Sequence, residues 1–287
     1  MGSRQLPVAS KQTDAKSIVL SETLVQVAMP RAVEDGTSNV AFRSAKERCF
    51  RGAKGDIGNR ERYSRYKRRQ TDMERLSFSN ISYHQLTSLV AIREEVDDSQ
   101  FNGWLVHDPT TDFETNEFLL SLASRHRKNI DGYSEEEVKA KLIIPMLNRI
   151  DFTVGPYTDW YERPLAASIG GVEIAGIVDY LVARGEKEPT TPYFFIQEFK
   201  PQYPNRSPEV QLISEMLVAM TLSRELNELR GAYVHGSVWK FVLLRRVEVS
   251  YVYYVSPILD LFRMPDARSI YVALTNIREQ LVLESRS

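Results

Sequence analysis

The hydrophobic pattern of this chain changes from irregular to periodic near position 73. Before that point apolar residues keep no sustained period, except in the segment 17–29, SIVLSETLVQVAM, which fits either a short helix or a short strand. Beyond it, apolar residues recur at helical spacing in three segments, 82–96, 114–130 and 133–150. We therefore expect an unpatterned part, 1–72, followed by a folded part.

The last of these three segments, YSEEEVKAKLIIPMLNRI, predicts the best-defined helix. Ser134 is a good N-cap, and Glu137 follows three residues later, which is the spacing of a capping box. The inner face of the helix is predicted to contain Val138, Leu142, Met146 and either Arg149 or Ile150. Glu135 extends this face by one step toward the N-terminus, whereas Glu136 points further around the helix.

Strand patterns follow this helix. Segments rich in β-branched and aromatic residues at 158–169, 170–185 and 192–200 predict three consecutive strands, the first two joined by a Gly-Gly turn. Further strands are predicted at 232–236, 238–246 and 249–256, and a closing helix at 266–283.

A long helix is predicted between the third and fourth strands, at 207–231. Ser207 would be its N-cap, Pro208 its first residue and Gly231 its C-cap. The resulting order predicts one α/β domain of the layered α+β kind over 73–285. It would comprise a helical part at 76–130, a core at 133–256 with a mixed central sheet, and the closing helix.

Composition and charge divide the chain at the same place as the hydrophobic pattern. The 287 residues are 43% hydrophobic and 26% charged, as in ordinary globular proteins, with a formal net charge of −1. Residues 1–72 carry 15 Lys and Arg against 8 Asp and Glu, whereas the remainder carries 22 against 30. A basic arm on a mildly acidic body is therefore expected.

Two interpretations of this arm remain open. The stretch 43–69 holds 11 Lys and Arg against 3 acidic residues and little that could be buried, so disorder is expected. With Tyr63 and Tyr66 among the cations, the arm could bind nucleic acid. Alternatively it is a solvated tail, or sequence upstream of a true start at Met73.

Several classes of protein are disfavoured. Cys49 is the only cysteine, which excludes an intramolecular disulfide and a zinc site built from cysteines. No run of about 18 apolar residues predicts a membrane span, and the N-terminus lacks the apolar core of a secretory signal. No glycine-rich turn predicts a Rossmann or P-loop nucleotide site. We expect a cytoplasmic protein without a membrane partner.

The candidate chemistry lies on the second and third strands. Asp179 is in the middle of the apolar run AGIVDYLVA, and the strand PYFFIQEFK ends on Glu198 and Lys200, whose side chains share one face. If these two strands pair antiparallel through the loop at 185–191, Asp179 comes opposite the region of Glu198. Two carboxylates and one ammonium would then meet at one end of a sheet.

Two neighbouring carboxylates repel each other, and a divalent cation relieves the repulsion. Carboxylate oxygens suit Mg²⁺ or Mn²⁺, which retain water and accept phosphate oxygens, so the arrangement suits phosphodiester hydrolysis. The alternative is structural: Asp179 would be a buried, hydrogen-bonded aspartate, and Glu198 with Lys200 a solvated strand end.

The motif GIVDYLV followed by FFIQEFK resembles the D…(D/E)-x-K signature of the PD-(D/E)XK, restriction-endonuclease-like superfamily. The resemblance covers about 133–245, is closest to the nuclease domain of type I restriction motor subunits, and implies that family's α-β-β-β-α-β order. Residues 73–285 as a whole are also similar to uncharacterised bacterial proteins common in cyanobacteria. Val178 stands where the motif's name has proline. Many relatives lack that proline.

The resemblance also implies roles for individual residues. Asp179 and Glu198 would hold the metal ion, and Lys200 would orient or deprotonate the attacking water. Glu135, or Glu136 if the helix phase is shifted by one residue, would assist the metal site. Gln211, in the sequence EVQLISEM, would hold the site or contact the nucleic-acid backbone.

We therefore predict a nuclease that uses Mg²⁺ or Mn²⁺ to hydrolyse DNA, with RNA as the other candidate substrate. The alternative is a non-catalytic module of the same fold that binds nucleic acid or a protein. The oligomeric state stays open, a homodimer included. His235 is interpreted either as a substrate contact near the sheet edge or as a satisfied core histidine.

Overall fold

The computed structural model describes residues 74–204 and 207–286. The predictions for 1–72, including the arm at 43–69, and for a start at Met73 lie outside the described residues.

The described residues form a mixed nine-stranded sheet in the order β1-β4-β5-β6-β7-β8-β2, with β3 paired to β4 and β9 to β7. The strands are β1 Arg75–Ser77, β2 Ile92–Glu94, β3 Tyr157–Ile169, β4 Val172–Arg184, β5 Thr190–Lys200, β6 Glu228–His235, β7 Val238–Val247, β8 Ser250–Val255 and β9 Leu259–Asp260. The helices are α3 Tyr83–Leu89, α4 Phe113–His126, α5 Glu135–Val138, α6 Ile144–Ile150, α7 Pro208–Leu222 and α8 Met264–Glu284, with short 3₁₀ turns at Asp98–Phe101 and Ile130–Gly132.

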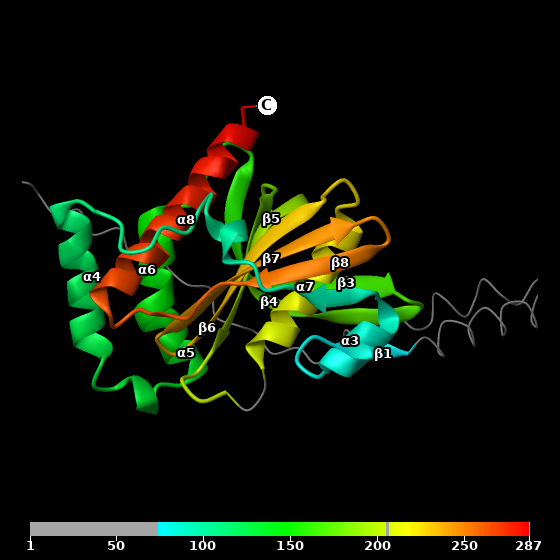
Figure 1. Cartoon of the computed structure of the whole chain (residues 1–287), viewed down its shortest axis with the longest axis horizontal. Helices are drawn as coiled ribbons and strands as arrows, with labels where there is room; N and C mark the ends of the chain where they lie inside the picture. The colour runs from blue at the N-terminus through cyan, green and yellow to red at the C-terminus, as the bar shows by residue number, and fades with distance from the viewer. Residues whose placement is uncertain (1–73, 205–206, 287) are drawn as a thin grey trace, which may run out of the picture. The chain divides into compact units, whose positions relative to one another are not determined.

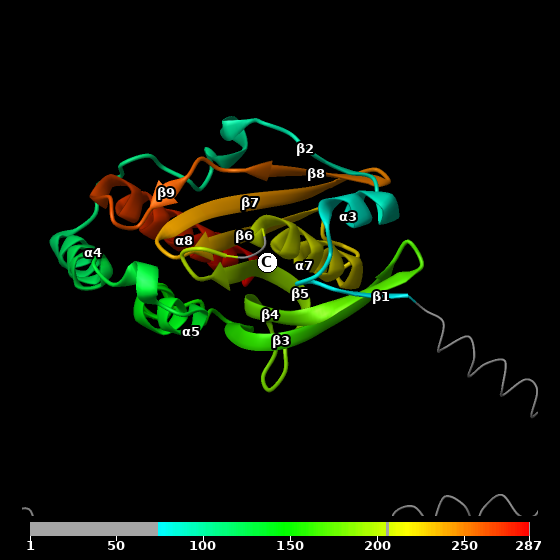
Figure 2. The ribbon, with the colours of Figure 1, turned by 90° about the horizontal axis from the view of Figure 1, so that it is seen from below.

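Helices pack against both faces of this sheet (Figures 1 and 2). One hydrophobic core lies between the sheet and α4, α5, α6 and α8, and a second lies between the sheet and α3 and α7. Side chains of β7 alternate between the two cores. Trp239, Phe241 and Leu243 lie in the first core, and Val242 and Leu244 lie in the second. The predicted mixed α/β class is confirmed.

The best-defined predicted helix forms as expected at its start. Ser134 accepts a hydrogen bond from the Glu137 N–H (3.3 Å), and its own N–H donates to Glu137 (3.1 Å), which completes the capping box. A π-helical turn, Lys139–Ile143, joins α5 to α6. Pro145 lies just beyond it and has no N–H for an α-helical hydrogen bond, which favours such a local widening.

Two predicted helices extend too far. The segment 82–96 leaves the helix after Leu89, and Ile92–Glu94 instead pairs in parallel with β8, so strands interrupt the predicted helical part at 76–130. Helix 207–231 ends at Leu222, and Gly231 lies inside β6 rather than at a C-cap. A Cβ at Gly231 would lie 2.9 Å from the Met216 sulfur, so glycine is needed there for close packing of α7 on the sheet.

The predicted three-strand meander β3–β4–β5 is confirmed. β3 and β4 pair antiparallel along their length, except at Glu162 and Asp179, through a turn at Gly170 and Gly171, both with positive φ. On its other edge β4 changes partner: Glu173–Ala175 pairs with β1, whereas Tyr180–Arg184 pairs with β5. This change of partner separates β4 from β5 at Asp179.

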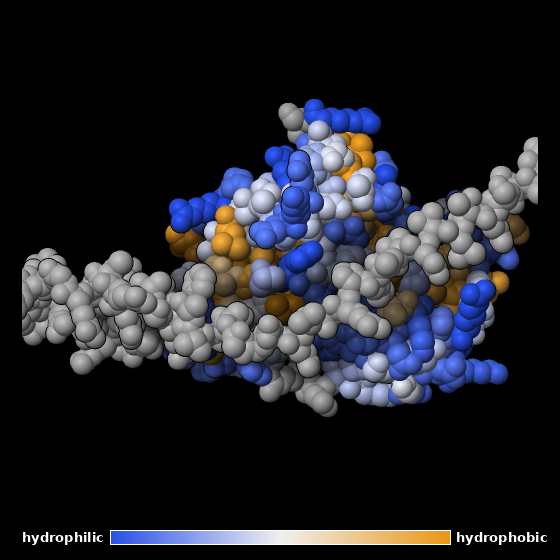
Figure 3. All heavy atoms as spheres, turned by 180° about the vertical axis from the view of Figure 1, so that it is seen from behind, coloured by the Kyte–Doolittle hydropathy of each residue, from blue (hydrophilic) through white to orange (hydrophobic). Residues whose placement is uncertain are grey.

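The surface of the described residues is mixed in character. On the face shown in Figure 3, hydrophobic areas are interspersed with hydrophilic ones. Among the described helices, none combines the length and hydrophobicity that crossing a membrane requires.

Candidate active site

Asp179 occupies the point at which β4 and β5 diverge. The last paired residues are Tyr180 and Gln197, so Asp179 is the first residue of β4 beyond the pairing and faces Glu198. Its carboxylate accepts a hydrogen bond from the backbone N–H of Phe199 (2.9 Å), a donor that strand pairing would otherwise have satisfied. The sheet geometry itself therefore holds this carboxylate at the end of β5.

Glu198 and Lys200 lie on the same face of β5, as the strand period requires. The Glu198 side chain is completely buried, and one of its carboxylate oxygens accepts a hydrogen bond from the Lys200 ammonium. Lys200 also donates to the backbone carbonyl of Phe199 (3.0 Å). The other Glu198 oxygen, Oε2, is buried without a hydrogen-bond partner.

The helix start contributes both of the glutamates considered from the sequence. Glu135 lies 3.5 Å from the Lys200 ammonium, whereas Glu136 is more exposed and pairs with Lys139 (3.2 Å). Glu135 is therefore the glutamate that reaches the Glu198–Lys200 pair.

Lys139 is a member of the cluster that the sequence did not indicate. Its side chain is only 6% exposed, and its ammonium lies within 4 Å of three carboxylates: Glu136 (3.2 Å), Glu162 (3.3 Å) and Asp179 (3.8 Å). Helical spacing contained a signal for it, because Lys139 follows Glu135 by four residues and so shares its face.

Glu162 on β3 pairs with Lys139 and has an unusual backbone conformation. Its φ of 52° lies in the left-handed region, which costs a non-glycine residue of order 1–3 kcal/mol. No pattern in the sequence marked this position.

Glu215 on α7 is the third residue missed from the sequence. It is completely buried, and the Gln211 amide donates to its Oε1 (3.1 Å), while its Oε2 has no hydrogen-bond partner. Its neighbour Glu198 carries a second buried carboxyl group, and the two repel each other when both are ionised. A carboxyl inside the apolar run ISEMLVAM was the available signal, since buried acids require partners. Gln211 thus joins the cluster through Glu215.

Burial dominates the electrostatics of the acidic groups. Burial, with Asp179 adding to it and Lys200 opposing it, raises the pKa of Glu198 to about 8. Burial and the neighbouring Glu198 raise the pKa of Glu215 well above its usual range. Burial also raises the pKa of Glu135.

The two lysines remain protonated. Burial by itself lowers the pKa of Lys139 and of Lys200, but the surrounding carboxylates outweigh burial and raise both values. Asp179 and Glu136 act on Lys139, and Glu198 and Glu135 act on Lys200.

The cluster could hold a hard cation such as Mg²⁺ through two carboxylates, with water and substrate phosphate as the remaining ligands. Within residues 74–204 and 207–286, no three His, Cys, Asp or Glu side chains are arranged to hold a metal ion. Two carboxylates, Asp179 and Glu198, are nevertheless adjacent, and Glu198 has an oxygen without a partner. Mg²⁺ is commonly held by one or two carboxylates, with water and substrate phosphate completing its shell.

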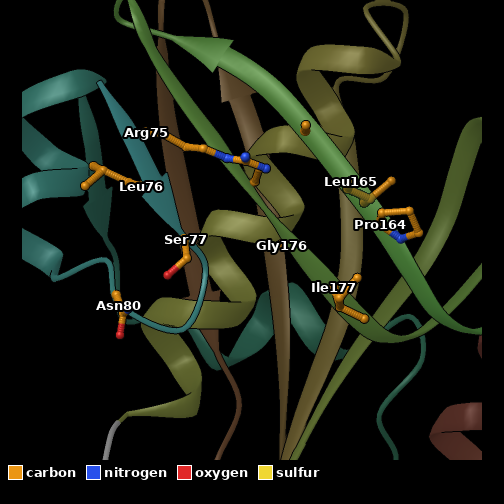
Figure 4. A pocket seen from close by; sticks show the side chains of 10 residues that line it. Arg75, Leu76, Ser77, Asn80, Pro164, Leu165, Gly176 and Ile177 are labelled. Atoms are coloured by element: carbon orange, nitrogen blue, oxygen red, sulfur yellow. The ribbon is translucent and has the colours of Figure 1, made fainter. Parts of the chain in front are cut away.

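A hollow elsewhere in the described residues offers less chemistry. It has a volume of about 630 Å³ and lies between β1 with its following turn and the strands β3 and β4 (Figure 4). Arg75 is the one charged residue of its lining, and it pairs with Glu173 (2.9 Å). We therefore place the candidate site at the carboxylate–lysine cluster.

Comparison with known proteins assigns no family. No protein-family model matches the chain, and no curated protein matches it either.

Proposed function

We propose that this protein is a metal-dependent nuclease that hydrolyses phosphodiester bonds in nucleic acid, with DNA as the expected substrate. The observation that carries the proposal is the meeting of Asp179 and Glu198 where β4 leaves β5, with the Lys200 ammonium on Glu198. Keeping two acids and two lysines in a largely buried cluster is costly for folding alone, which favours a functional reason.

Asp179 and Glu198 would hold the cation. Bound there, Mg²⁺ or Mn²⁺ would supply a more acidic water and charge neutralisation at phosphorus. The raised pKa of Lys200 keeps it an ammonium, which suits orientation of water and stabilisation of negative charge rather than proton abstraction. Glu135 would position Lys200, and Gln211 would orient Glu215 behind Glu198.

The order of elements supports the same proposal. A helix beginning near Glu135 precedes β3, β4 and β5, and α7 and β6 follow. This is the α-β-β-β-α-β order that a restriction-endonuclease-like core would have.

The test is a cleavage assay on the purified full chain with Mn²⁺ or Mg²⁺, using plasmid DNA, single-stranded DNA and RNA. Asp179→Asn and Lys200→Met are each expected to reduce cleavage at least about 100-fold, as loss of a charged transition-state contact does. Lys187→Met, in the exposed loop at the far end of β5, is the matched control and should retain activity. Circular dichroism and thermal melts check that each variant folds.

A wild-type chain that cleaves none of these substrates with either metal contradicts the proposal. Equal activity in Asp179→Asn and wild type contradicts it as well.

A non-catalytic binding module is the second candidate, and one observation favours it. Lys139 lies beside Asp179 and Lys200 beside Glu198, so the two carboxylates already have cationic neighbours. Thermal unfolding with increasing Mn²⁺ separates the candidates, because a ligand that binds the folded state raises its stability with concentration. A nuclease should show this rise and lose it in Asp179→Asn, whereas a binding module should show none.

A further inference from the structure

A second concave region lies beside the carboxylate–lysine cluster. It has a volume of about 470 Å³ and is lined at its polar side by Ser207, Tyr233, His235 and Lys240. Ser207 precedes the first turn of α7, and the other three residues come from β6 and β7.

The strand register places this hollow on the same face of the sheet as the cluster. In the parallel pairing of β5 with β6, Glu198 is opposite Tyr233 and Lys200 is opposite His235. In the antiparallel pairing of β6 with β7, Tyr233 is opposite Lys240. Directly paired residues point to the same face. His235 is therefore one strand from Lys200, about 5 Å across the sheet, and Lys240 is two strands from Glu198, about 10 Å across the sheet.

The polar groups of the hollow are mainly hydrogen-bond donors. Lys240 has no carboxylate within ion-pair distance among the described residues, and its ammonium lies 6.0 Å from the centre of the Tyr233 ring. The Ser207 hydroxyl makes no capping bond to α7 and is exposed. The carboxylate of Glu209 accepts a hydrogen bond from the Tyr233 hydroxyl (2.8 Å), but Glu209 is not part of the lining.

His235 adds a nitrogen that needs a partner. Its Nδ1 is buried and has no hydrogen-bond partner. Burial lowers the pKa of His235, while the backbone carbonyl of Gln202 opposes that change. A neutral imidazole has a single N–H, for which the Gln202 carbonyl is the acceptor, so His235 lines the hollow without adding a charge.

We propose that this hollow binds a phosphate group of the nucleic-acid strand next to the phosphate that lies at Asp179 and Glu198. The inference rests on the proposed function and extends it, because it names where the backbone continues. Lys240 supplies the positive charge, and the exposed Ser207 hydroxyl supplies a neutral hydrogen bond. A phosphate matches this set, since lysine binds it as a point charge and a hydroxyl group adds a hydrogen bond.

The test measures binding of fluorescent 20-nucleotide single-stranded and duplex DNA to the full chain in EDTA across a series of salt concentrations. Lys240→Gln should bind several-fold more weakly and lower the slope of log affinity against log salt by roughly 0.7–0.9, the effect of one lost phosphate contact. Lys187→Gln removes the same charge far from the hollow and should leave both quantities unchanged.

A second measurement identifies the phosphate. Otherwise identical oligonucleotides, each with one neutral methylphosphonate linkage, are compared for binding to wild type and Lys240→Gln. One linkage should weaken wild-type binding but have little further effect on Lys240→Gln, because the contact is already absent. Thermal melts check that the variant is folded.

The outcomes separate this inference from the proposed nuclease. If wild type cleaves with Mn²⁺ and the salt slope is the same in Lys240→Gln, the phosphate site is overturned and the nuclease stands. If wild type does not cleave but Lys240→Gln lowers the slope, the phosphate site stands in a binding module. A wild-type chain that binds neither DNA overturns the phosphate site.

Discussion

At the scale of the residue, Lys139 shows how the site is stabilised without a metal ion. Its ammonium is almost completely buried and is shared among Glu136, Glu162 and Asp179. An ammonium in such a position is stable only because the carboxylates compensate its lost hydration, and the mostly buried Asp179 in turn depends on it. The same charge beside Asp179 also limits how strongly the acids repel one another.

Lys139→Met should therefore reduce the free energy of unfolding by about 3 kcal/mol or more, because it leaves Asp179 in a buried site without its cation. Lys141→Met is the matched control: Lys141 lies two residues later and pairs with Glu137 at an exposed position, so the loss should be at most about 1 kcal/mol. Urea denaturation measures both. Equal losses in the two variants would show that Lys139 acts as an ordinary surface lysine.

At the scale of the element, close contact between α7 and β6 decides where a helix ends and a strand runs. α7 is buried over most of its circumference, from Leu212 to Met220, so it needs cover from the sheet. Gly231 has no side chain and so lets α7 approach β6 closely. An added Cβ would lie 2.9 Å from the Met216 sulfur and 3.0 Å from the Ile196 carbonyl oxygen. The sequence rule that reads glycine as a helix C-cap was wrong here because tertiary packing also selects glycine.

We expect Gly231→Ala to lower the free energy of unfolding by about 1–3 kcal/mol, since the added methyl overpacks the contact between α7 and β6. Gly103→Ala is the control, because a Cβ at Gly103 meets no atom within 4 Å. Chemical denaturation compares the two variants with wild type. An unchanged midpoint for Gly231→Ala would mean that α7 shifts to accommodate the methyl at little cost.

At the scale of the whole molecule, burial of acidic side chains makes the free energy of unfolding depend on pH. Glu198 lies between the sheet and α7 and has a pKa of about 8 in the folded chain, against about 4.5 when exposed. Between these values the folded state holds a proton that the unfolded state has released. The contribution of Glu198 to stability is therefore present below pH 4.5 and is lost as pH rises through 8.

Unfolding in urea without divalent metal should accordingly show stability falling between pH 5 and 8, by roughly 3–5 kcal/mol from Glu198 at about 1.4 kcal/mol per pKa unit. Glu198→Gln should reduce this slope because the amide does not titrate, while Glu215, whose pKa is also raised, keeps part of it. Glu117→Gln, at an exposed position on α4, serves as the control and should keep the wild-type slope. A steep slope that persists in Glu198→Gln would locate its origin in another group.

The sequence by itself determined what depends on neighbours along the chain. The capping box at Ser134, the inner stripe from Val138 to Ile150 and the meander β3–β4–β5 follow from local propensity and period. The antiparallel pairing of β4 with β5 followed as well, because a short loop joins them, but two register shifts between Val182 and Arg184 set the pairing that brings Asp179 opposite Glu198.

Only the tertiary structure decided the features that depend on distant residues. Ile92–Glu94 became a strand because β8 offered its edge, although the local pattern was helical. Lys139 and Glu215 joined the site because packing of α5 and α7 on the sheet placed them beside Asp179 and Glu198. A single sequence carries its local preferences, but strand pairing and helix packing bring together residues far apart in the chain, and local preferences do not specify those contacts.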